Sequence, residues 1–324
     1  MLGRDLVDVL TEAGEDVTGY TRQELDITDA SAVAEAVKGY HVVINAAAYT
    51  NVDGAETDEA QATAVNGHAV AGVAAACADA GARLIQISTD YVFDGTATEP
   101  YDEDAPTAPI NAYGRSKLIG EQAVLKLLPL TGYVVRTAWL YGAYGRNFVT
   151  TMLRLATQRQ TIDVVDDQRG QPTWSRALAR QIRALARSGM AGYAPAGVYH
   201  GTASGSTTWY GLARAVFAEA GLDPDRIRPI PSTAYPRPAR RPAYSVLGHN
   251  RWIGTKVPPA ADWRAMLSEA MAYPAFQQAI REASHTPRDA AEATSESERT
   301  PQTQGTPRLT SSTDTSATPA SEEG

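Results

Sequence analysis

The chain has 324 residues, 43% hydrophobic and 20% charged, a composition typical of a globular protein with one or two α/β domains. Its formal net charge of −8 argues against a nucleic-acid partner, which would require a basic face. A single cysteine, Cys77, excludes an intrachain disulfide framework, and its Ala-rich helical context predicts burial. No apolar run reaches membrane-spanning length and the N-terminus has no signal-peptide pattern, so we expect a cytoplasmic protein without a membrane partner.

The first half of the chain alternates predicted helices and strands. Apolar residues at helical spacing predict a helix over 2–13, which Gly14 would end. A short strand is predicted over 15–21, and Asp29 is placed to cap the helix after it. The next elements are a strand over 41–48, a helix over 57–80, a strand over 83–88, a helix over 115–128 and a strand over 133–139. This alternation predicts an α/β fold with a parallel, doubly wound sheet.

After Trp139 the pattern becomes richer in turns. The predicted helices are 149–158, 175–187, 207–220, 260–272 and 274–283, with strands beginning near 161 and 197. We expect residues 1–146 to bind a dinucleotide and residues 147–283 to form a smaller, mixed α/β part that binds substrate. Residues 284–324 are rich in Ser, Thr, Glu, Pro and Gln. Such a segment cannot bury enough apolar surface to offset its chain entropy, so we predict a disordered, non-catalytic tail.

Residues 86–121 carry the most informative group of polar side chains. Thr89 stands at the predicted carboxyl end of a strand, where ligands of open α/β sheets bind. Tyr113 and Lys117 lie one turn apart on one helix face. An adjacent ammonium lowers the pKa of a tyrosine, which would make Tyr113 a proton donor near neutral pH. The three residues predict a ketone-reducing site; the alternative is an ordinary exposed helix turn.

The sequences STDYVFDG and YGRSKLIGE resemble the extended short-chain dehydrogenase/reductase superfamily, and within it the dTDP-4-dehydrorhamnose reductase family. The resemblance covers about residues 1–283. It implies NAD(P)H-dependent reduction of the 4-keto group of a dTDP-linked 6-deoxy sugar. The substrate would be dTDP-4-dehydrorhamnose or a related sugar of antibiotic biosynthesis, such as a dihydrostreptose precursor. We expect a monomer or a homodimer.

The same resemblance implies a set of substrate-binding residues. They lie at the catalytic strand end or in loops of the second half: Asp90, Trp139, Asn147, Arg169, Gln171, Thr173 and Arg241. The two arginines could pair with a pyrophosphate through forked hydrogen bonds, although a loop arginine is often only a solvated charge. Trp139 would face the sugar or the nicotinamide; the alternative is a core aromatic.

The cofactor prediction rests on the strand expected to end near Thr21. An acid after this strand suits NAD, whereas an arginine suits the 2′-phosphate of NADP. Arg22 stands there, with Asp26 beyond it, so NADPH is predicted and NADH is the alternative. Small residues at a strand end let a ligand approach the backbone. The other expected cofactor contacts are Gly3, Ala46, Ala47, Ala48, Tyr113 and Lys117.

A metal is not required by this chemistry. Some members of the family are described with Mg²⁺, but no acidic pair stands out in this chain. The five histidines are scattered without metal-ligand spacing, so no metal ligands are assigned.

Two further expectations concern the whole chain. Met1-Leu2-Gly3-Arg4 resembles the end of a glycine fingerprint, so we expect the working protein to begin upstream; a fragment with poor cofactor affinity is the alternative. A second function class is a non-catalytic binding module, resembling the regulatory subunit of methionine adenosyltransferase. The intact Thr89, Tyr113 and Lys117 argue against that role.

Overall fold

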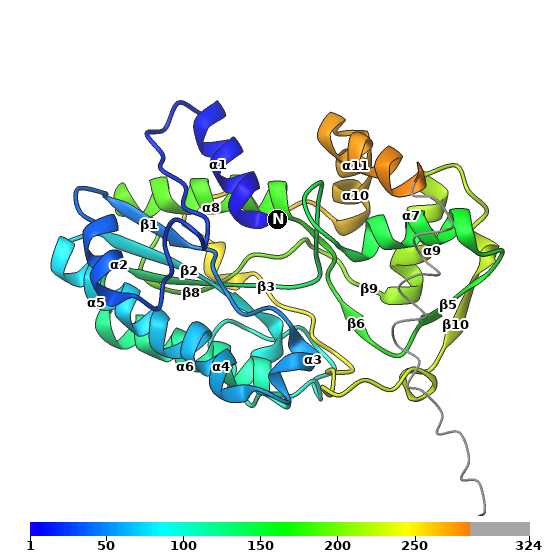
Figure 1. Ribbon diagram of the computed structural model, residues 1–324, viewed down its shortest axis with the longest axis horizontal. Coiled ribbons are helices and arrows are strands. Elements are labelled where there is room, and N and C mark those ends of the chain that lie inside the picture. The colour runs from blue at the N-terminus through cyan, green and yellow to red at the C-terminus, as the bar shows by residue number, and fades with distance from the viewer. Residues whose placement is uncertain (286–324) are drawn as a thin grey trace, which may run out of the picture. The chain divides into compact units, whose positions relative to one another are not determined.

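Four parallel strands form the central sheet in the order β1-β2-β3-β8. They are β1 (Val42–Asn45), β2 (Arg83–Thr89), β3 (Gly132–Thr137) and β8 (Gly197–His200). The structure is a computed structural model that describes residues 1–285, which form one compact unit (Figure 1). The predicted tail lies outside the described residues, except that its first two residues end the last helix. The parallel sheet confirms the predicted fold class.

Helices cover both faces of this sheet (Figure 1). On one face, α1 (Leu2–Glu12) and α8 (Ser175–Met190) pack against Ile85, Ile87 and Val135. On the other face, α2 (Ala30–Ala36), α5 (Ala69–Ala80) and α6 (Ala112–Leu127) cover Leu84 and Val134. Successive side chains of a strand point to opposite faces of the sheet, so Leu84 and Ile85 pack in different layers, as do Val134 and Val135. Cys77 is buried in the second of these layers, as predicted.

The predicted helix over 57–80 is confirmed from residue 59 onward, but a π-helical turn that the sequence did not predict lies inside it. The helix consists of α4 (Glu59–Thr63), the π turn over Ala64–His68, and α5, and a short separate helix, α3 (Val52–Ala55), precedes it. Asn66, inside the π turn, accepts a hydrogen bond from the Tyr49 amide and donates to its carbonyl and to the Ser116 hydroxyl. These contacts with distant segments hold the wider turn in place.

The predicted strand over 15–21 is wrong, because residues 15–20 have no regular structure. A strand is stabilised by ladder hydrogen bonds to a neighbour. Among residues 1–285 the sheet ends at β1, which pairs with β2 alone, and 15–21 has no ladder partner. Asp29 caps α2 through the amides of Ser31 and Ala32, as predicted.

The second half of the described chain has its own buried cluster. The helices α7 (Phe148–Gln158), α9 (Trp209–Glu219), α10 (Trp263–Ala272) and α11 (Pro274–His285) surround Val149, Met152, Val216, Leu267 and Phe276. Three two-stranded ladders join them: β5 (Ile162–Val165) with β10 (Ile227–Ile230), β4 (Leu140–Tyr141) with β7 (Thr173–Trp174), and β6 (Arg169–Gly170) with β9 (Thr207–Thr208). The division at residue 146 stays a prediction, because residues 1–285 cluster as one unit.

No helix within residues 1–285 is both long and apolar enough to cross a membrane.

Candidate active site

Thr89 and Tyr113 meet at the carboxyl end of β2. Thr89 is the last residue of that strand, and its hydroxyl accepts a hydrogen bond from the Tyr91 amide at 3.1 Å. Tyr113 is the second residue of α6. Asn111 caps the N-terminus of this helix, because its side-chain oxygen accepts a hydrogen bond from the Gly114 amide at 2.8 Å. The Thr89 hydroxyl lies close enough to the Tyr113 side chain to oppose the rise of its pKa. The first turn of α6 therefore fixes the phenol beside the strand-end hydroxyl.

The pKa of Tyr113 is raised above its ordinary value, first by burial and then by the negative charge of Asp90. The expectation that Lys117 lowers this pKa is wrong. The Lys117 ammonium instead donates to the Ile87 carbonyl at 2.6 Å, and burial lowers its own pKa to about 8. Tyr113 is therefore a protonated phenol across the neutral range, which is the state a proton donor requires.

Asp90 brings a buried carboxyl group to the same place. It is 3% exposed, and burial raises its pKa to about 6, against the opposing effect of the Ser245 and Thr89 hydroxyls. Its Oδ1 accepts from Thr89 at 3.0 Å, while its Oδ2 has no partner. The hydroxyl of Thr137 is also buried without a partner, and Thr137 pairs with Thr89 in the sheet register. Such orphaned groups mark a place where an external ligand can complete the hydrogen bonding.

A buried ion pair joins α6, the helix of Tyr113 and Lys117, to β3. Arg136 of β3 donates to both oxygens of Glu121 on α6, with a closest approach of 2.7 Å and exposures of 4% and 1%. Arg136 also donates to the Glu103 carbonyl and lies over the Phe93 ring. Glu121 stands one turn beyond Lys117 and opposes the lowering of its pKa. The sequence reasoning missed Glu121, although its position four residues after Lys117 was a usable signal.

Arg241 lies close to this centre. Its guanidinium pairs with both carboxylate oxygens of Asp53, with a 3.0 Å contact to Oδ2, and hydrogen-bonds the Tyr91 side chain. Tyr91 in turn packs edge-on against Tyr113. Arg169 lies on the neighbouring segment, because its amide donates to the Ala243 carbonyl at 2.8 Å. Its exposed guanidinium contacts Ser206.

Three other predicted substrate residues use their side chains inside the protein. Gln171 is 2% exposed and hydrogen-bonds Ala203, Thr202 and Leu247. Thr173 is 1% exposed; it donates to the Gln171 carbonyl and accepts from the Ala203 amide. Asn147 caps α7. These contacts shape the loops, and direct substrate binding by the three residues stays a prediction.

The predicted cofactor residues fall into two groups. Gly3, at the start of α1, lies against Ala46 just after β1, so that a Cβ on Gly3 would stand 3.9 Å from that of Ala46. The Ala47 amide is held by the Asn45 side chain at 3.1 Å. Arg22 and Asp26 form a separate, exposed pair at 3.9 Å, beside a loop rather than a strand.

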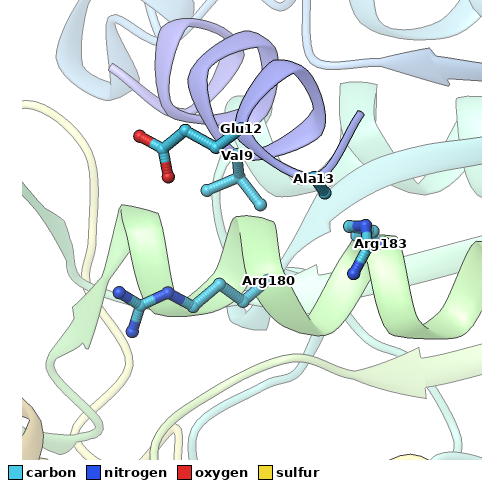
Figure 2. A pocket seen from close by; sticks show the side chains of 5 residues that line it. All are labelled: Val9, Glu12, Ala13, Arg180 and Arg183. Atoms are coloured by element: carbon cyan, nitrogen blue, oxygen red, sulfur yellow. The ribbon is translucent and has the colours of Figure 1, made fainter. Parts of the chain in front are cut away.

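Residues 1–285 contain no group of three or more His, Cys, Asp or Glu side chains that could hold a metal ion. A surface hollow of about 250 Å³ opens between α1 and α8 (Figure 2), and its lining residues are Val9, Glu12, Ala13, Arg180 and Arg183. Arg183 pairs with Glu15, and Arg180 with Glu269. None of these residues belongs to the group around Thr89, so the hollow has no part in that site.

A doubly wound parallel sheet with a strand-end Thr and a Tyr and Lys one turn apart on the next helix defines a short-chain reductase. Residues 1–275 match the family described as the RmlD substrate binding domain, and the chain belongs to this family. It is 52% identical over 272 residues to a dTDP-4-dehydrorhamnose reductase of Streptomyces griseus, covering 83% of this chain and 90% of that one.

Two further relatives extend the comparison. The chain is 50% identical over 272 residues to a dTDP-4-keto-6-deoxy-D-glucose reductase of Streptomyces niveus, covering 83% of this chain and 93% of the relative. The crystal structure of a Bacillus anthracis dTDP-4-dehydrorhamnose reductase in complex with NADP superposes with a TM-score of 0.79 at 38% identity. That alignment covers 83% of this chain and 94% of the other.

Proposed function

We propose that this protein reduces the 4-keto group of a dTDP-linked 6-deoxy sugar with NADPH. The observation that carries the proposal is the convergence of Thr89, Tyr113 and Lys117 at the carboxyl end of β2, in a chain about half identical to reductases of such sugars. Relatives of similar identity act on different sugars by name, so we propose dTDP-4-dehydrorhamnose and related antibiotic-pathway sugars as the substrate class.

The chemistry divides among the residues at the strand end. A bound nicotinamide cofactor supplies the hydride that reaches the carbonyl carbon. The Thr89 hydroxyl holds the keto oxygen, and Tyr113 gives its phenolic proton to that oxygen as the C–H bond forms, so that the ketone becomes an alcohol. Lys117, one turn along α6, donates to the Ile87 carbonyl and is a proposed contact of the bound cofactor. Asp90 and Thr137 offer their unpartnered oxygens to the sugar hydroxyls.

The cofactor and diphosphate contacts follow from the same geometry. Gly3 and Ala46–Ala48 are small residues where α1 and β1 meet, and they would leave room for a dinucleotide. We assign the 2′-phosphate of NADPH to exposed Arg22, and NADH is the alternative. Arg169 and Arg241 would neutralise the substrate diphosphate. Gln171, Thr173 and Asn147 would act through the loops that they stabilise. A monomer or homodimer is the proposed assembly.

The test is NADPH oxidation by the purified full-length chain, with dTDP-4-dehydrorhamnose and dTDP-4-keto-6-deoxy-D-glucose as separate substrates. We expect turnover that depends on the sugar nucleotide and is slower with NADH. A folded chain that binds NADPH but reduces neither sugar, nor a wider panel of dTDP-4-keto sugars, would favour the non-catalytic binding module.

A further inference from the structure

The corner at the end of β3 has an unusual backbone. Trp139 has a φ of 47°, in the left-handed region that bulky side chains rarely adopt. Among the non-glycine residues of the described chain, Lys256 alone shares a positive φ. Strain of this kind persists where surrounding contacts over-determine the conformation, and it concentrates at functional sites. Contacts with neighbouring residues must therefore hold Trp139 in this conformation.

A second tryptophan supplies the main contact. The Trp209 indole stacks on that of Trp139, with ring centroids 3.6 Å apart and planes 8° from parallel. Phe148 packs against Trp209 at 4.7 Å. Gly170 approaches Trp139 so closely that a Cβ there would stand 2.6 Å from the indole. The Trp139 side chain is thus fixed from two elements, and both indoles remain partly exposed.

The β6–β9 ribbon explains how the two tryptophans meet. Its register pairs Gly170 with Thr207 and Arg169 with Thr208, and Trp209 follows directly as the first residue of α9. The Thr208 hydroxyl caps α9 by accepting from the Gly211 amide at 3.0 Å. One ribbon therefore brings both Gly170 and the Trp209 indole to the corner at β3.

We propose that Trp209 is a positioning residue for the substrate sugar: it fixes the Trp139 indole so that the stacked pair forms a wall for the sugar ring. This inference rests on the proposed function. Trp139 stands two residues beyond Thr137, which pairs with Thr89, so the wall directly follows the strand end beside Thr89. The closed stack leaves no room for a ring between the indoles. The sugar therefore contacts an outer face.

The first experiment measures the pair in the protein alone. Two indoles in such contact give an exciton couplet in the far-UV circular dichroism spectrum. We expect the couplet in the wild type, its loss in Trp139→Phe and Trp209→Phe, and its retention in Trp263→Phe. Trp263 is a matched control: it begins α10, packs against the same buried cluster, and contacts Arg264 rather than a second indole.

The second experiment separates positioning from folding. Trp209→Ala should raise KM for the keto sugar about three- to tenfold, the range expected for loss of one aromatic contact, and leave kcat within about twofold. Trp209→Phe should give a smaller rise in KM, and Trp263→Ala none. NADPH affinity and dTDP affinity should stay within about twofold of the wild type in all variants.

Three outcomes would overturn the inference. The first is a couplet that persists in Trp209→Phe, and the second is a KM for Trp209→Ala equal to that of Trp263→Ala. The third is a parallel loss of dTDP affinity, which would move the contact to the nucleotide. Failure of the proposed function can be distinguished from failure of this inference. A wild-type protein that turns over no dTDP-keto sugar should still show the exciton couplet, because the couplet depends only on the contact between the two indoles.

Discussion

Tyr113 holds a protonated phenol beside the strand-end hydroxyl of Thr89, and this pairing makes it the proposed acid. We expect Tyr113→Phe to lower kcat by about 10²–10⁴-fold, the usual contribution of a positioned general acid. NADPH affinity and thermal stability should change little, because the ring and its packing remain. Steady-state kinetics and cofactor titration measure both effects. Tyr193→Phe, at a half-exposed position, is the control and should behave like the wild type. Turnover by the Tyr113 variant within a few-fold of the wild type would exclude the assignment.

Asp90 gives a pH-dependent prediction of stability. The ordinary pKa of its carboxyl is 3.8 and the folded value is about 6, so ionising it in the folded protein costs about 3 kcal/mol. Because the folded pKa is raised, the folded protein does not bear this cost below pH 4, and the free energy of unfolding falls as pH rises from 4 through 6. Asp90→Asn should therefore raise the free energy of unfolding at pH 8, by about 1–3 kcal/mol, with a smaller gain at pH 4.

Urea unfolding at the two pH values measures this difference. Asp163→Asn is the control, because Asp163 pairs with Arg228 at an exposed position. An Asp90 variant whose unfolding free energy shifts equally at both pH values would contradict the buried, proton-linked carboxyl. The same variant should lose substrate affinity if Asp90 contacts the sugar.

At this scale, the sequence predicted the placement of the proposed catalytic residues but not their electrostatics. Helical spacing alone predicts that Tyr113 and Lys117 share a face, and they occupy one helix as expected. The direction of the Lys117 ammonium depends on the Ile87 carbonyl, which belongs to a strand 30 residues away in sequence. Such a partner is visible only in the folded chain.

At the scale of elements, α6 fits against its neighbours through glycines. A Cβ on Gly120 would stand 2.3 Å from the Asn66 carbonyl oxygen of the π turn, so the two segments approach at backbone distance. Gly120→Ala should destabilise the protein by about 1–3 kcal/mol, the usual cost of overpacking. The expected sign is opposite to the ordinary gain of replacing a helical glycine by alanine.

Gly72 of α5 is the matched control, because a Cβ there would meet no atom within 4 Å. Gly72→Ala should stabilise by about 0.5–1 kcal/mol. Thermal unfolding of the two variants beside the wild type measures both signs. Equal effects from the two substitutions would show that the approach of α6 to the π turn is not tight.

Helices and strands could be predicted from the sequence where the local pattern of apolar residues and capping residues determines them. The helices α1, α6, α7 and α8 and the strands β2 and β3 follow from periodicity and caps. The π turn at Asn66 and the missing strand over 15–21 do not, because each depends on partners far away in sequence. β10 lies in a segment whose prolines and arginines predict a loop. Among the described residues this strand pairs only with β5, so it is an edge strand and tolerates Pro229.

At the scale of the whole molecule, hydrogen bonds connect the Pro- and Arg-rich segment 237–245 to α3 and to the start of α6. The Asn111 side chain donates to the Arg240 carbonyl at 2.9 Å, and Asp53 holds both Arg241 and the Ala239 amide. Such contacts between residues more than 100 positions apart could not be predicted from the sequence. They fix the segment beside the start of α6, where we propose that the substrate diphosphate binds.

Asp53 is the centre of this connection, so its removal should loosen the segment. The Asp53–Arg241 pair is three-quarters or more buried on both sides, and one lost partner leaves the other uncompensated. We expect Asp53→Asn to raise the rate of tryptic cleavage after Arg240 about tenfold, because cleavage follows the population of the locally opened state. Asp163→Asn, which breaks an exposed pair of little energetic value, should leave that rate unchanged. Mass spectrometry of the first fragments identifies the cleaved bond. If Asp53→Asn is cut no faster than the wild type, the remaining contacts of the segment hold it without the carboxylate.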